Sequence, residues 1–415
     1  MRRARAPRVG ALAFSCLAGW VLVGWAPAAR GQPTIETPNE LPRATETTTI
    51  GGYGQLDLKF RRVGFGNDFD GRANVRRVVL LVGHQWTDSI RSYVELEWEN
   101  AVTCSACQGV TEVEQAYVEA AIAPSIWGHK LAVRAGLILV PMGIINRWHE
   151  PPVFFSVDRP SFDQSVIPST WRELGAGLVG RVSDRWRGEL YLMTGLDPSH
   201  LGPDGIGGGR SSGMLAPVRS GALVGRVEFE PWLGTVAGLA GYASDMAPNG
   251  AFYDASGARV SPHFPLLGWA VDARSRHAGF ELRLVAAQFF LPRSGALMDT
   301  RRADGSRYYV DPATTGAVPN RTQGGYLELG YDLLRAIWPG TSAQLLVFAR
   351  AEHYDTQAAV PVPFRPQGQF TVDEFTAGLS FLPIHQVVAK ADFQLRDRRY
   401  GLDELQINFG IGWLF

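Results

Sequence analysis

The chain has 415 residues, with 40 basic and 40 acidic side chains and 46% hydrophobic residues. This balance provides no net charge that would attract a nucleic acid, so we expect no nucleic-acid partner. Beyond the first thirty residues, no apolar run approaches the length of a membrane-spanning helix, which excludes a helical membrane protein.

The first 28 residues have the pattern of a secretory signal peptide. Arginines at positions 2, 3, 5 and 8 precede a largely apolar run over 9–25, and an Ala-Pro-Ala sequence follows, ending at Ala28. A transmembrane helix is the alternative, but the run is short and contains two glycines. We therefore predict a signal peptide at 1–28, a periplasmic segment at 29–47 and one domain at 48–415.

Strand-like segments fill the predicted domain. Many alternate apolar and polar residues at every second position, which is typical of strands between lipid and a wet lumen. A soluble β-sandwich also has alternating, half-buried strands and is the alternative. We predict about sixteen strands, near 48–60, 73–86, 90–100, 112–122, 130–139, 171–182, 186–195, 220–230, 234–244, 266–274, 277–290, 322–332, 341–352, 371–381, 386–396 and 403–415.

The last predicted strand shows the alternation most strictly. One face carries Leu405, Ile407, Phe409, Ile411, Trp413 and Phe415, and the other carries Gln406, Asn408, Gly410 and Gly412. Outer-membrane barrels usually close with such a strand and end on an aromatic residue. We expect it to pair with the first strand, 48–60, which leaves the sheet without an open edge.

The connections alternate between short and long. Tight turns are predicted at 87–89, 183–185, near Pro231 and at 275–276, and long connections at 140–170, 196–219, 245–265, 291–321 and 353–370. Short turns on one rim and long loops on the other are typical of outer-membrane barrels. We predict an all-β fold, a transmembrane antiparallel β-barrel of about 16 strands, which is wide enough to leave an aqueous channel.

Several segments resemble the phosphate-selective porin O/P family: SYVELEWE, EVEQAYVEA, RAGLILVPMGIINRWHEPPVFFSVDRP and WRELGAGLVGRV. The resemblance covers most of the predicted mature chain and is strongest from about 77 to 181. It implies a trimeric outer-membrane barrel that passes small anions by diffusion. It also implies a long inward-folded loop after the fifth strand, with basic side chains at the constriction. The loop at 140–170 takes that place in this sequence.

Charged side chains within strands are expected to face the lumen, because charge is costly on the lipid face. By alternation the inward cations are Lys59, Arg77, Arg91, Arg134, Arg187, Arg226, Arg283, Lys390 and Arg396. The inward acids are Asp57, Glu95, Glu97, Glu189, Glu228, Glu281 and Asp392. Such a mixture forms either a transverse electric field or a set of neutralising ion pairs, and the sequence leaves both possibilities open.

Two arginines in the candidate inward loop, Arg147 and Arg159, are the strongest candidates for anion contact. Arginine can hold an oxyanion through two parallel hydrogen bonds. The alternative is that Arg147 pairs with Glu150, and Arg159 with Asp158 or Asp163, so that both fix the loop. The predicted channel-lining and anion-binding residues are Arg147, Arg159, Arg134, Arg77, Lys59, Lys390 and Arg396.

Cysteine and histidine patterns indicate no metal site, cofactor or enzyme. Cys104 and Cys107 lie in TCSACQ, and in an oxidising compartment we predict that they form a disulfide. No second cysteine pair is present to complete a zinc site. The histidines are scattered singly, and neither G-x-S-x-G nor H-E-x-x-H occurs. His149 beside Glu150 is the nearest catalytic candidate, and a lone loop histidine is usually structural.

The sequence therefore predicts an outer-membrane porin: a water-filled channel for passive diffusion of small hydrophilic solutes, with anions such as phosphate expected. It would be a homotrimer surrounded by outer-membrane lipid. The glycine-rich stretch GPDGIGGGRSS is predicted to be a flexible solvent loop. A non-conducting structural or adhesin barrel and, less favoured, an outer-membrane barrel enzyme are the alternatives.

Overall fold

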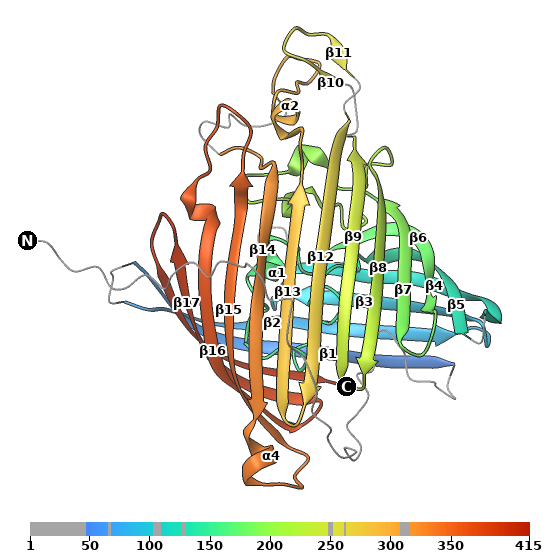
Figure 1. Ribbon diagram of the computed structural model, residues 1–415, viewed down its shortest axis with the longest axis vertical. Helices are drawn as coiled ribbons and strands as arrows, with labels where there is room; N and C mark the ends of the chain where they lie inside the picture. Colours follow the sequence, from blue (N-terminus) through green and yellow to red (C-terminus); the bar gives the residue numbers. More distant parts are fainter. Residues whose placement is uncertain are drawn as a thin grey trace, which may run out of the picture. The chain divides into compact units, whose positions relative to one another are not determined.

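The protein folds as a closed antiparallel β-barrel of sixteen strands, shown in Figure 1. The computed structural model describes residues 47–64, 68–102, 109–126, 129–247, 252–260, 263–307 and 316–415. The predicted signal peptide, most of the predicted periplasmic segment and the predicted disulfide between Cys104 and Cys107 lie outside the described residues. Among the described residues, no helix combines the length and apolar character needed to cross a membrane.

All sixteen predicted strands are present. They are β1 (Thr48–Val63), β2 (Asp70–Gln85), β3 (Ile90–Glu99), β4 (Val110–Ile126), β5 (His129–Leu139), β6 (Arg172–Arg181), β7 (Trp186–Thr194), β8 (Gly221–Trp232), β9 (Thr235–Met246), β12 (Phe264–His277), β13 (Phe280–Phe290), β14 (Arg321–Asp332), β15 (Gln344–Ala359), β16 (Thr371–Ile384), β17 (Val387–Arg398) and β18 (Glu404–Leu414). The prediction of an all-β barrel of this size is confirmed.

Short elements lie in the connections. A two-stranded sheet of β10 (Phe252–Tyr253) and β11 (Arg259–Val260) stands between β9 and β12. The described helices are α1 (Phe162–Ser165), α2 (Ser294–Met298) and α4 (Leu333–Ile337), with 3-10 turns η1 (Pro198–His200), η2 (Gly207–Gly209) and η3 (Gly368–Phe370).

The last strand closes the barrel as predicted. β18 pairs with β17 on one side and with β1 on the other, where Leu58 lies opposite Phe409 and Lys59 opposite Asn408. At the end of the chain, the Phe415 amide donates to the Gly52 carbonyl at 2.8 Å. Closure pairs the backbone groups of both edge strands, which leaves no open edge to solvent or lipid.

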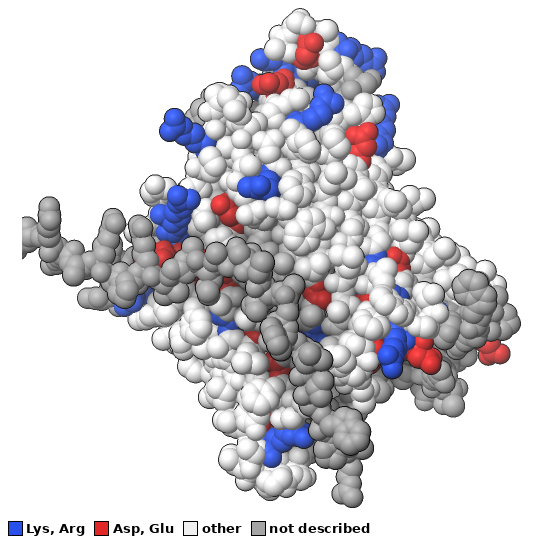
Figure 2. Space-filling view, in the orientation of Figure 1, with Lys and Arg blue, Asp and Glu red and all other residues white. Residues whose placement is uncertain are grey.

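The strands separate an apolar outer face from a polar inner face. On β18, Phe409 and Ile411 are 45% and 51% exposed, whereas Asn408 is fully buried. On β17, Leu395 is exposed and Lys390 is buried. Figure 2 shows charged side chains around the end that carries β10 and β11 and again in the lower half of the view, with a largely uncharged surface between them. This separation matches the faces that alternation predicted.

An arginine on the outer face is expected to destabilise the barrel in lipid. Phe409 lies in the middle of β18. In a bilayer, Phe409→Arg should lower the free energy of unfolding by about 2–4 kcal/mol, because the charge would face hydrocarbon. Denaturant unfolding in lipid vesicles, followed by tryptophan fluorescence, would measure this change.

The control for this substitution is Val362→Arg, in the loop between β15 and β16. Val362 is 93% exposed and lies outside the strands. It should tolerate arginine with little change in stability. Equal destabilisation by the two substitutions would contradict a lipid-facing position for Phe409.

The rims differ in loop length as predicted, with two corrections. β12 runs through His277, so the turn lies at Ala278–Gly279 rather than at 275–276. Both turn residues have positive φ (51° and 89°), the geometry that two-residue hairpin turns require. β15 extends to Ala359, which shortens the loop predicted at 353–370 to 360–370.

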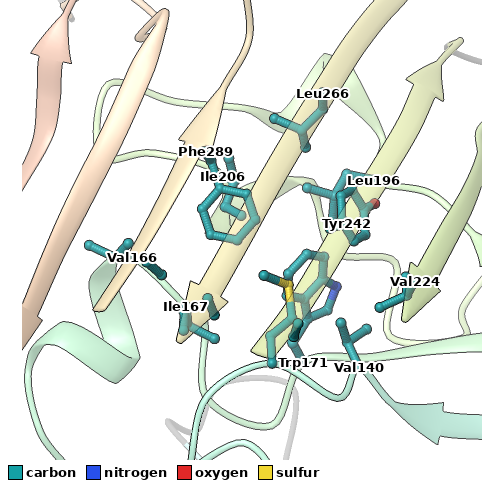
Figure 3. Packing of buried hydrophobic residues seen from close by; sticks show 14 of the residues in the cluster. Val140, Val166, Ile167, Trp171, Leu196, Ile206, Val224, Tyr242, Leu266 and Phe289 are labelled. Carbon is teal, nitrogen blue, oxygen red and sulfur yellow. The ribbon is translucent and has the colours of Figure 1, made fainter. Parts of the chain in front are cut away.

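The connection between β5 and β6, residues 140–171, folds into the barrel, where it contacts strands from β1 and β17 to β7, β8 and β9. We call this segment the inward loop. Its apolar residues pack against inward-facing residues of β9 and β13, as Figure 3 shows for Trp171, whose ring centroid is 5.0 Å from that of Tyr242. The interior is therefore partly filled by an apolar cluster, which corrects the expectation of a channel without a filled core.

The glycine-rich segment is also packed, contrary to the prediction of a flexible solvent loop. Leu201 and Ile206 are 4% and 3% exposed and belong to the main apolar cluster. The glycines 207–209 form the short 3-10 turn η2. The apolar residues that flank the glycines anchor this segment inside the rim, so composition alone was misleading.

Candidate functional site

A polar cavity of about 250 Å³ lies between the inward loop and the wall formed by β1–β4. Its lining includes five arginines, Arg76, Arg77, Arg159, Arg172 and Arg210, and four acidic residues, Glu97, Glu99, Glu112 and Asp158. We regard this cavity as the candidate functional site because it combines water-accessible space with a concentration of guanidinium groups.

A β-bulge brings two consecutive arginines to this cavity. The register between β1 and β2 passes from Gln55 opposite Arg77 to Leu56 opposite Val75, so Arg76 has no partner on β1. Bulges re-aim side chains in this way. Strict alternation predicted only Arg77 inside, and Arg76 was missed because the bulge depends on the register between two strands.

Most charges around the cavity form ion pairs across neighbouring strands or onto the loop. Arg76 pairs with Glu99 at 3.0 Å, and Arg77 pairs with Glu97 at 3.1 Å. Arg172 pairs with Glu112, and Lys59 pairs with Asp158 at 2.6 Å. Each of the four acidic residues in the lining therefore has a cationic partner.

Arg159 and Arg210 differ from the other arginines of the lining. Within the described ranges, neither forms an ion pair with a carboxylate. Arg159 donates to the His149 carbonyl at 3.2 Å, and Arg210 donates to the carbonyls of Gly207 and Ser169 at 2.9 and 3.0 Å. Carbonyl contacts orient a guanidinium group without neutralising its charge.

The electrostatic surroundings of these two arginines agree with their contacts. Burial lowers the pKa of Arg159, and the positive charge of Arg77 adds to this effect. Burial likewise lowers the pKa of Arg210, with Arg172 as the next cause. Both groups remain cationic, since arginine does not lose its proton in proteins. Carboxylates act on both groups only at longer range, Glu97 and Glu114 on Arg159 and Glu112 and Glu173 on Arg210. The cavity therefore holds two positive charges that have no ion-pair partner among the described residues.

The other arginine predicted to contact anions, Arg147, is not among the residues that line the cavity. It pairs with Glu189 on β7 at 2.6 Å and with Glu228 on β8. The alternative pairing with Glu150 is therefore wrong, because the loop turns Arg147 toward a different part of the wall. The alternative pairs of Arg159 with Asp158 or Asp163 are also not formed among the residues that the structure describes.

The remaining predicted channel-lining residues point inward but have protein partners. Arg134 pairs with Glu119 at 2.7 Å, and Arg396 pairs with Glu374 at 2.7 Å. Lys390 donates to the carbonyls of Phe154 and Ser156. The mixture of inward charges thus consists largely of neutralising pairs and loop anchors, one of the two possibilities that the sequence left open.

Strand side chains also hold the backbone of the inward loop. Glu352 accepts a hydrogen bond from the Phe162 amide at 2.8 Å, and Asp392 accepts one from the Val157 amide at 2.6 Å. Gln55 donates to the Val157 carbonyl at 2.8 Å. These bonds satisfy backbone groups that an inward loop would otherwise leave unpaired, and they fix the loop beside the cavity.

Comparisons with known proteins agree with this architecture. No family model matches the chain. Among solved structures, the chain resembles an anion-selective porin from Comamonas acidovorans (12% identity, 89% of this chain and 99% of that one, TM-score 0.53). It also resembles the outer-membrane channel DcaP of Acinetobacter baumannii (12%, 89% and 97%, TM-score 0.54) and Pseudomonas putida OprB (10%, 89% and 94%, TM-score 0.55).

These structural similarities show the fold of outer-membrane porins, while the predicted membership of the phosphate-selective porin O/P family stays a prediction. A closer relative is known by sequence. A protein of Aquifex aeolicus (strain VF5), described only as uncharacterized, is 30% identical over 372 residues, which are 88% of this chain and 80% of that protein. The chain therefore belongs to the same family as this Aquifex protein.

Proposed function

We propose that the protein is an outer-membrane porin that conducts small hydrophilic anions passively through the polar cavity. The observation that carries this proposal is the pair Arg159 and Arg210, whose charges face the cavity without a carboxylate partner among the described residues. Unpaired cations beside water attract anions and repel cations. The porin fold supports the same function, and the solved neighbours are named as porins and channels.

Oxyanions such as phosphate are the favoured solutes within this proposal. A guanidinium group can donate two parallel hydrogen bonds to one oxyanion, which a monatomic anion cannot accept in the same way. Residues of three segments that are distant in sequence meet at the cavity: Arg77 on β2, Arg159 on the inward loop and Arg210 between β7 and β8. This convergence would allow an oxyanion to exchange one arginine for the next as it passes.

Single-channel recording tests the proposal on the wild-type protein. In a planar bilayer with a salt gradient, we expect stepwise increases in conductance. The sign of the reversal potential should show that anions permeate more readily than cations. Phosphate added to chloride solutions should reduce the chloride current by occupying the arginines. A trimer, which we also propose, should show three equal conductance levels per insertion.

The outcomes separate the alternatives. A barrel that inserts but does not conduct would support a structural or adhesin role and would overturn the pore. A cation-selective reversal potential would leave the pore standing and overturn the role of the two arginines. We propose no enzymatic activity and assign no catalytic residue.

A further inference from the structure

A second cluster of polar residues lies where the inward loop meets β3 and β4. It consists of Glu95 on β3, Glu114 on β4 and His149 on the loop, which are 2%, 0% and 2% exposed. One ligand atom from each residue lies within 4.8 Å of the others. Carboxylate oxygens and imidazole nitrogens are the ligands that bind Zn²⁺ and related ions in proteins.

A β-bulge creates the cluster. Glu95 lies opposite Gln115, whereas the next residue of β3, Leu96, lies opposite Val113, so Glu114 is the extra residue of β4. Glu114 and Gln115 consequently both face the interior and are buried. Gln115 donates to Oε2 of Glu95 at 2.7 Å, which orients this carboxylate with its other oxygen toward the cluster.

The distances within the cluster are those of long ion pairs and also match the spacing of two ligands on one tetrahedral ion. Nε2 of His149 lies 3.5 Å from Oε1 of Glu95 and 3.4 Å from Oε2 of Glu114. Hydrogen bonds from nitrogen to oxygen usually span about 2.7–3.2 Å. Two atoms that each lie about 2.0–2.2 Å from a tetrahedral ion are about 3.3–3.6 Å apart.

Tyr53 on β1 faces the same two oxygens. Its hydroxyl lies 3.3 Å from Oε1 of Glu95 and 3.4 Å from Oε2 of Glu114. These are again longer than usual hydrogen bonds between oxygens. The fourth side of the cluster is therefore polar, and the phenol oxygen or a water beside it would complete a tetrahedral set.

Unpartnered buried atoms give an independent indication of a ligand. Among the described residues, Nδ1 of His149 and Oε1 of Glu114 have no hydrogen-bond partner, and Nε2 of His149 makes only the two long ion-pair contacts given above. Buried polar groups are nearly always hydrogen-bonded, so each exception requires an explanation. A bound cation would use the imidazole nitrogen and the carboxylate oxygens together.

We propose that Glu95, Glu114 and His149 bind one divalent transition-metal ion, with Zn²⁺ as the ion to test. The ion would link the inward loop to β3 and β4 at a point where the described side chains provide only long contacts. Arg159 donates to the carbonyl of His149, so the same ion would help to hold Arg159 at the cavity. This proposal depends on the cluster alone and not on which solute the barrel conducts.

The test uses the full chain, folded in detergent, without a histidine tag and stripped of metal by a chelator. Calorimetric titration with ZnCl₂ should show one tight site per chain, and Co²⁺ in its place should give the visible absorption of a tetrahedral complex. His149→Gln and Glu114→Gln should each weaken Zn²⁺ binding at least about tenfold, since each removes a ligand. The matched control is His277→Gln, on the exposed end of β12, which should bind as the wild type does.

Three outcomes would overturn the proposal. The first is that the wild type fails to bind one Zn²⁺ per folded chain, which would identify His149 as a cation paired with the two carboxylates. The second is that His149→Gln and Glu114→Gln both bind Zn²⁺ as tightly as the wild type does. The third is that only the control, His277→Gln, loses Zn²⁺ binding. If His149→Gln does not fold, Glu114→Gln and the wild-type titration still decide between these results.

Discussion

The double substitution Arg159→Ala and Arg210→Ala is expected to remove most of the anion preference of the channel. Two unit charges that are about 4 Å apart interact with an energy of about 1 kcal/mol in bulk water. At the effective dielectric constant near a protein surface, the interaction energy is about 4 kcal/mol. Removing two such charges from the cavity should therefore lower the ratio of anion to cation permeability by about tenfold or more. Reversal potentials in a salt gradient measure this ratio, and the effect should shrink at high ionic strength because salt screens the charges.

Arg159→Lys and Arg335→Ala are the controls for this experiment. Lysine keeps the charge but cannot form the two parallel hydrogen bonds, so Arg159→Lys should retain anion selectivity and weaken the block by phosphate. Arg335 is exposed on α4, in the connection between β14 and β15, and should not affect selectivity. Unchanged selectivity in the double variant would show that the conducting path avoids the cavity.

The strands and the outer face were predictable from sequence because their signal is local. On β17 and β18, a residue faces the lumen or the outside according to whether its position in the strand is odd or even. Alternation was therefore sufficient to predict the two faces. Alternation failed at Arg76 and Glu114, where a bulge sends two consecutive residues inward. Residues 112–122 do not alternate strictly in the sequence, which fits the second bulge, but the position of that bulge depends on the register with β3.

The partners of the inward charges could not be predicted, because they come from distant parts of the chain. Glu150 is close to Arg147 in sequence, yet Arg147 pairs with residues 42 and 81 positions away. Arg210 was overlooked because its segment is rich in glycine, although nearby Leu201 and Ile206 gave a signal for packing. The metal cluster was missed for the same reason, since its three residues come from three segments.

Arg350→Met is expected to cause the largest loss of stability, because Arg350 is the centre of a buried network inside the barrel. The guanidinium group is 1% exposed and pairs with Glu352 at 2.7 Å and Glu328 at 3.0 Å. It also donates to the Ser156 hydroxyl at 2.6 Å, which ties the network to the inward loop. Methionine would fill similar space but would leave buried carboxylates without this partner, at a cost of about 3–5 kcal/mol.

The unfolding free energy of Arg350→Met, measured with denaturant in lipid vesicles, would check this prediction against Arg335→Met. Arg335 is exposed, so that control should change stability by no more than about 0.5 kcal/mol. Adding Glu352→Gln to Arg350→Met should recover part of the loss, since it removes a charge that has lost its partner. The double variant restores the charge balance but not the contact with Ser156. Recovery of stability without recovery of the wild-type conductance would therefore show that Arg350 positions the inward loop. Similar unfolding free energies for Arg350→Met and Arg335→Met would instead mean that the network contributes little and that backbone contacts alone hold the loop.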